Sequence, residues 1–126
     1  VLGMISNKGS RDFQFLKSNK KQIYQHVIEK CMLYGTPENM MFVIGATHEE
    51  IFKEIRHFSP YHFFLVPCLY SHGGDLQKLS HFVLNKDVGL LVNATRSVIY
   101  AGNGKDFAEK ARAEALRMNQ IMKTFL

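Results

Sequence analysis

Side chains suited to binding an anion lie in two loops in the second half of the chain. Gly73 and Gly74 follow His72, and Arg96 follows the apolar run at residues 89–93. Glycines let backbone N–H groups come close to an anion, and a guanidinium holds phosphate through two parallel hydrogen bonds. The pattern predicts a phosphate site to which both loops contribute.

The other polar residues near expected strand ends have weaker claims. Ser6 either hydrogen-bonds a ligand or simply ends a strand as a turn residue, and the turn is the favoured interpretation. Cys68 has no histidine or asparagine partner that the pattern can assign, so a packed thiol is favoured over a nucleophile. The histidines lack zinc-ligand spacing, and no pair of carboxylates falls at strand ends. The residues alone show no catalytic machinery.

Each anion-binding candidate also has an ordinary alternative. A lone loop histidine such as His72 is more often a solvated bystander, and an arginine after a strand often pairs with a surface carboxylate. Arg96 is the stronger candidate because it lies between an apolar run and the apolar residues 98–100.

Apolar runs alternate with helical periodicities along the chain. Strands are expected at residues 1–6, 40–46, 63–67 and 89–93, and helices at about 21–34, 48–58, 75–84 and 107–125. Thr47 and Asp75 are candidate N-caps. Strands that are apolar on both faces, separated by amphipathic helices, predict an α/β fold with a parallel sheet covered by helices.

The length of these repeating units favours half of a barrel. Four strand-helix units of about 31 residues each are half of the roughly 250 residues of a (β/α)8 TIM barrel. We therefore expect residues 1–126 to form one domain without a linker, a half barrel with strands five to eight and their helices. An open doubly wound sheet is the alternative, although no dinucleotide fingerprint is present. Both architectures place functional residues beyond the carboxyl ends of the strands.

Composition and charge limit the function classes. The chain is 46% hydrophobic with a net charge of +5, and no apolar run is long enough to cross a bilayer. Two cysteines do not make a disulfide framework, so we expect a reducing, cytoplasmic location and no membrane partner. Much of the positive charge lies in one cluster, which we interpret as a solvated loop rather than a nucleic-acid surface: Lys8, Arg11, Lys17, Lys20 and Lys21.

Several stretches, in order along nearly the whole chain, resemble bacterial orotidine 5'-phosphate decarboxylases. They are residues 6–7 (SN), 9–10 (GS), 12–13 (DF), 41–47 (MFVIGAT), 63–67 (FFLVP), 73–76 (GGDL), 89–101 (GLLVNATRSVIYA) and 106–115 (DFAEKARAEA). The resemblance implies a (β/α)8 barrel, usually a homodimer. It also implies conversion of orotidine 5'-phosphate to uridine 5'-phosphate in pyrimidine biosynthesis, without cofactor or metal.

The resemblance also assigns roles to single residues. Ser6 matches the family serine that contacts the pyrimidine, Pro67 the proline beside the base, and Arg96 the arginine that grips the phosphate. His72 falls where the family has a glutamine that links base and phosphate. The loop at residues 68–74 departs further from the family, because two of the family's glycines are replaced by residues with side chains.

The family's alternating lysine and aspartate catalytic residues belong to its N-terminal half and have no counterpart in these 126 residues. We therefore expect no decarboxylase activity from this chain alone. The alternative is a non-catalytic half-barrel module that binds phosphate or a nucleotide. Half a barrel leaves its first and last strands unpaired, which predicts self-association or pairing with an N-terminal half-barrel.

Overall fold

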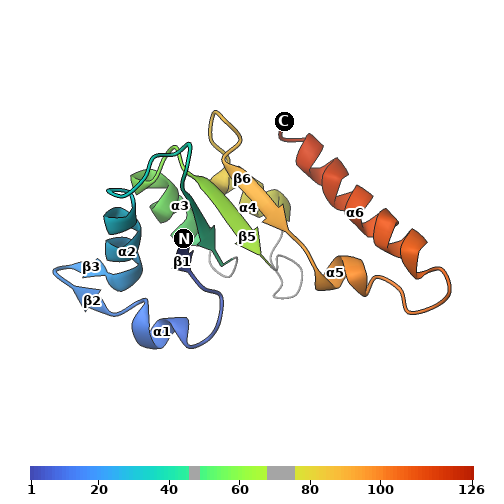
Figure 1. Cartoon of the computed structure of the whole chain (residues 1–126), viewed down its shortest axis with the longest axis horizontal. Coiled ribbons are helices and arrows are strands. Elements are labelled where there is room, and N and C mark those ends of the chain that lie inside the picture. Colours follow the sequence, from blue (N-terminus) through green and yellow to red (C-terminus); the bar gives the residue numbers. More distant parts are fainter. Residues whose placement is uncertain (46–48, 68–75) are drawn as a thin grey trace.

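A four-stranded parallel sheet is the centre of the molecule (Figure 1). The computed structural model describes residues 1–45, 49–67 and 76–126. The sheet order is β1-β4-β5-β6, with neighbouring strands parallel throughout. Its strands are β1 (Leu2–Met4), β4 (Met41–Ile44), β5 (Phe63–Pro67) and β6 (Leu90–Asn93).

Helices connect and flank these strands. The longer helices are α2 (Ile23–Cys31), α3 (Glu49–Phe58), α4 (Leu76–Val83) and α6 (Phe107–Lys123), and the short ones are α1 (Ser10–Phe13) and α5 (Arg96–Ile99). A two-stranded hairpin, β2 (Lys17–Ser18) and β3 (Lys21–Gln22), precedes α2. None of the helices in the described ranges combines the length and apolar character needed to cross a bilayer.

One face of the sheet carries the hydrophobic core. Alternate strand residues point to this face and are buried: Met4, Phe42, Ile44, Phe64, Val66 and Leu90. Helices α2, α3 and α4 contribute the opposing layer through Ile28, Ile55 and Val83, each fully buried. The apolar side chains that recur at helical spacing in these helices are therefore the ones that face the sheet.

The other face of the sheet is apolar but open. Leu2, Val43, Leu65 and Leu91 occupy one register row across all four strands. Leu2 is 57% exposed and Leu91 is 49% exposed, and the two middle residues are partly buried. Within the described residues, no helix covers this row, so the sheet keeps the two-sided apolar character of a parallel sheet with only one side packed.

Arg56 of α3 binds the segments that lead into the amino-terminal ends of β5 and β6. Its guanidinium donates hydrogen bonds to the carbonyl oxygens of His62 at 2.7 Å, Val83 at 2.8 Å and Gly89 at 3.0 Å. Its central carbon also lies 3.8 Å from the centre of the Phe64 ring. Arg56 thereby joins α3, the end of α4 and the entries to β5 and β6.

The structure confirms the four parallel strands and corrects several boundaries. The helix expected over residues 21–34 spans only Ile23–Cys31: Lys21 and Gln22 pair with Ser18 and Lys17 in the hairpin, and residues 32–34 form a turn. The hairpin, α1 and α5 were not predicted, and residues 8–21 were wrongly read as a plain loop. The candidate caps Thr47 and Asp75 lie outside the described residues.

Candidate functional site

The carboxyl ends of the four strands place the predicted site residues along one edge of the sheet. Ser6 follows β1, Gly45 follows β4, and Pro67 ends β5 in register with Asn93 of β6. Arg96 comes three residues after Asn93. The strand order therefore brings Ser6, Pro67 and Arg96 to the same edge from three different strands, as the sequence predicted.

Ser6 is half-buried and lies against the end of the neighbouring strand. The Gly45 N–H donates to the Met4 carbonyl at 2.9 Å, which continues the pairing of β1 and β4 beyond their ends. A β-carbon on Gly45 would lie 2.4 Å from the Ser6 backbone nitrogen, closer than any real contact allows. The Ser6 backbone therefore occupies space that only a glycine at position 45 leaves open.

Arg96 is the first residue of α5 and its side chain is exposed. Among the residues that the structure describes, no carboxylate lies within ion-pair distance of its guanidinium. The ordinary alternative for an arginine after a strand, a surface ion pair, is therefore not met in this part of the chain. Among the described residues, its guanidinium is therefore open to an anion at the strand-end edge.

His72, Gly73 and Gly74, the other predicted anion-binding residues, lie outside the described residues, as does Cys68. Their assignment stays a prediction.

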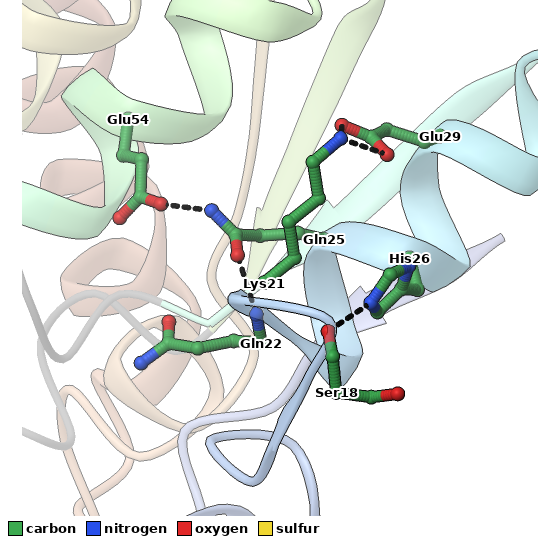
Figure 2. A network of polar contacts seen from close by, with 7 residues as sticks. All are labelled: Ser18, Lys21, Gln22, Gln25, His26, Glu29 and Glu54. Carbon is green, nitrogen blue, oxygen red and sulfur yellow. Dashed lines mark hydrogen bonds and ion pairs between the residues drawn. The ribbon is translucent and has the colours of Figure 1, made fainter.

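The basic cluster that was considered as a nucleic-acid surface includes Lys21, and this lysine makes contacts within the molecule (Figure 2). Lys21 is bonded to both carboxylate oxygens of Glu29, at 2.7 and 2.8 Å, and a ring nitrogen of His26 lies 2.7 Å from the Ser18 carbonyl oxygen. Gln25 extends the network by donating to Glu54 of α3. The bonds of Glu29 and His26 fasten the hairpin to α2 and so assign Lys21 a structural role, and the bond from Gln25 joins α2 to α3.

The described residues line a cavity near each end of the sheet. One of about 290 Å³ lies between the end of β6, α5 and α6, with a mostly apolar lining that includes Val92, Val98 and Met118. The other, of about 340 Å³, lies at the N-terminal edge between Pro37 and Phe63. No cluster of three or more metal-ligating side chains occurs in the described ranges.

Curated proteins of known activity are similar to almost the whole chain. The orotidine 5'-phosphate decarboxylase of Flavobacterium johnsoniae is 43% identical over 122 residues, which are 97% of this chain and 45% of the relative. That of Porphyromonas gingivalis is 39% identical over 127 residues, 100% of this chain and 46% of the relative. The chain is a homologue of the orotidine 5'-phosphate decarboxylases. It spans about half the length of the curated relatives it matches, which agrees with the predicted C-terminal half.

Solved structures agree with this relationship to the decarboxylases. The Leishmania donovani OMP decarboxylase superposes with a TM-score of 0.75 at 28% identity, over 96% of this chain and 46% of that one. The Leishmania donovani UMP synthase gives a TM-score of 0.78 at 30% identity, over 96% of this chain and 27% of that one. No protein-family model matches the chain. The predicted half barrel is confirmed, and the open doubly wound sheet is not.

Proposed function

We propose that this chain is the phosphate- and base-binding half of an orotidine 5'-phosphate decarboxylase and that it binds orotidine 5'-phosphate or uridine 5'-phosphate. The observation that carries the proposal is the position of Arg96, exposed at the strand-end edge and free of a carboxylate partner in the described part of the chain. The homology to the decarboxylases supplies the chemical class of the ligand.

The spacing along the edge suits an elongated ligand. Ser6 follows β1 and Arg96 begins the helix after β6, and these two outer strands are three strand spacings, or about 14 Å, apart. Pro67 lies between them. We assign the phosphate to Arg96 and the pyrimidine to the side of Pro67 and Ser6, with His72, Gly73 and Gly74 completing the phosphate contacts.

Binding and chemistry belong to different parts of this fold. Decarboxylation needs charges that favour the loss of the substrate carboxylate, and the lysine-aspartate pattern that supplies them in the family has no counterpart in these 126 residues. We propose that the chain alone binds nucleotide without turning it over, and that catalysis requires an N-terminal half-barrel. A cytoplasmic location and the family's homodimeric assembly belong to the same proposal.

Titration of uridine 5'-phosphate into the purified chain tests the phosphate site. Arg96→Ala is expected to weaken binding about 10- to 100-fold, because a charge-assisted bidentate contact is lost. Arg112→Ala, a matched change at an exposed position of α6, is expected to leave the affinity unchanged. Equal affinities for the parent and Arg96→Ala contradict the assignment.

The second candidate, a nucleotide-binding module without catalytic purpose, is separated by complementation. A polypeptide with the unmatched part of the Flavobacterium johnsoniae relative is mixed with this chain, and carbon dioxide release from orotidine 5'-phosphate is measured. Activity that appears only in the mixture supports the decarboxylase half. Nucleotide binding without activity in the mixture favours the module.

A further inference from the structure

We propose that Gln14 and Gly45 are positioning residues that hold the Ser6 backbone in place and thereby set the preference of the site for a nucleotide base. The inference rests on the proposed function of Ser6 as a base contact. It adds two residues that do not contact the ligand in that proposal. Gln14 acts on the backbone before Ser6, and Gly45 acts on the Ser6 backbone from the end of β4.

Gln14 fastens the backbone immediately before Ser6. Its Oε1 accepts a hydrogen bond from the Ile5 N–H at 2.9 Å, and its Nε2 donates to the Gly3 carbonyl at 3.4 Å. One side-chain amide therefore satisfies two backbone groups of the β1 segment on its unpaired side, where no further strand of the described sheet lies.

Gln14 is itself held by the core. Its own N–H donates to the Ser10 carbonyl at 2.7 Å, and its carbonyl accepts from the Tyr24 N–H at 3.1 Å. Tyr24 is fully buried at the start of α2. The side-chain amide thus extends from a backbone fixed at the junction of α1 and α2, so its grip on Ile5 is pre-organised.

Gly45 confines the Ser6 segment from the side of β4. An added β-carbon would lie 2.4 Å from the Ser6 nitrogen, 2.8 Å from the Ile5 carbonyl carbon and 2.9 Å from the Ser6 α-carbon. All three are backbone atoms, which cannot move aside as the end of a flexible side chain can. Gln14 thus holds the Met4–Ile5 peptide through the Ile5 N–H, and the bare backbone of Gly45 packs against the next peptide, Ile5–Ser6.

Two successive peptides held in this way set the position of the Ser6 α-carbon, from which its hydroxyl side chain extends. Arg96 begins α5, which follows the strand at the opposite edge of the sheet, so a disturbance of Ser6 is expected to leave the phosphate grip intact. The two positioning residues therefore affect the base end of a nucleotide and not its phosphate end.

The test compares two ligands, uridine 5'-phosphate and ribose 5-phosphate, by titration into the full 126-residue chain. Gln14→Leu is expected to weaken uridine 5'-phosphate binding about 5- to 10-fold, the effect of one misplaced hydrogen bond, and to leave ribose 5-phosphate unchanged. The combined change with Ser6→Ala is expected to lose no more than Ser6→Ala alone, since Gln14 acts through Ser6. Gln120→Leu on the exposed side of α6 is the control.

Gly45→Ala supplies a second variant, with Gly9→Ala as its control because a β-carbon on Gly9 meets only a carboxylate oxygen 4.0 Å away. The same preferential loss of uridine 5'-phosphate affinity is expected for Gly45→Ala. Equal losses for both ligands, or none, in both Gln14→Leu and Gly45→Ala overturn the inference.

Hydrogen exchange of the Ile5 amide separates this inference from the proposed function. Its N–H bonds to the Gln14 side chain, so exchange in Gln14→Leu is expected to quicken by about 10-fold or more while the core amides keep their protection. If the parent binds neither ligand but this amide is released, the proposed function fails and the positioning by Gln14 stands. Unchanged Ile5 exchange in a folded Gln14→Leu overturns the positioning itself.

Discussion

Arg56 shows how a cation can serve the fold without a carboxylate. In the part of the chain that the structure describes, its hydrogen bonds go to backbone carbonyls, three of which belong to His62, Val83 and Gly89. Burial lowers the pKa of the guanidinium to about 10, so it stays charged at neutral pH. The carbonyl dipoles and the face of the Phe64 ring offset its partial loss of water.

Arg56→Met is expected to lower the free energy of unfolding by about 2–4 kcal/mol, because several carbonyls lose a charged donor at once. Urea unfolding followed by circular dichroism measures the change. Arg112→Met, at an exposed site, is expected to stay within about 0.5 kcal/mol of the parent. Coincident unfolding curves for Arg56→Met and Arg112→Met refute the structural role of Arg56.

His62 is a buried histidine whose ring nitrogens have no hydrogen-bond partner among the described residues. Its side chain packs on Phe42, with ring centres 5.3 Å apart, and the residue is 7% exposed. Burial lowers its pKa, the charge of Arg56 lowers it further, and the charge of Glu38 partly opposes both. The folded state therefore favours the neutral ring.

The depressed pKa of His62 predicts a loss of stability in mild acid. The unfolded chain takes up the proton near pH 6.5, before the folded chain does, so the His62 contribution is present above about pH 6.5 and is lost as the pH falls toward the folded pKa. His62→Phe removes the titrating group and is expected to flatten the stability profile between about pH 6.5 and 5. Urea midpoints across this range measure it, and His57→Phe at an exposed position should leave the slope in place.

At the scale of elements, the β2–β3 hairpin depends on side chains of α2, the helix that follows it directly. Its turn uses Asn19 and Lys20 with φ of 51° and 68°, the positive values that a two-residue hairpin turn requires. Two-residue strands have little stability of their own. The bonds from Lys21 to Glu29 and between Ser18 and His26 hold the hairpin against α2 (Figure 2).

Glu29→Gln is expected to loosen the hairpin and leave the rest of the fold unchanged. The ion pair is exposed, so the global free energy of unfolding should fall by no more than about 1 kcal/mol. Hydrogen exchange of the hairpin amides should quicken, while the amides of β4 and β5 keep their protection. Glu114→Gln, which breaks the Arg117 pair on α6, is the matched control and should not affect the hairpin.

The sequence predicts elements well where burial dictates the pattern. The four parallel strands are apolar runs, and their order and the position of Ser6, Pro67 and Arg96 follow from the half-barrel interpretation. The hairpin escaped prediction because its residues are polar and its turn places a lysine at positive φ. The role of Gln14 was not predicted, because a glutamine in a sequence does not indicate which backbone groups its side chain will bind. Gly45 did carry a signal, since a glycine at the end of an apolar strand indicates a close backbone approach.

At the scale of the whole molecule, the open face and the unpaired edges belong to one incomplete structure. The row Leu2, Val43, Leu65 and Leu91 crosses the sheet from edge to edge, and β1 and β6 each lack a neighbour on one side within the described sheet. Apolar side chains and free strand edges together favour association with another polypeptide. The match to about half the length of the decarboxylases explains the open face and the unpaired strand edges, since a barrel needs further strands to close.

Self-association of the isolated chain is therefore expected, with a mass in solution above the 14.5 kDa of one copy. Leu91→Lys places a charge on the open row at a residue 49% exposed, so it should suppress association without disturbing the core beneath the sheet. Leu116→Lys on α6 alters a residue 43% exposed away from the row and should leave association intact. Light scattering after size exclusion, over a range of concentrations, measures both variants. A parent that remains monomeric throughout, or equal association of Leu91→Lys and the parent, shows that the open row is not the contact.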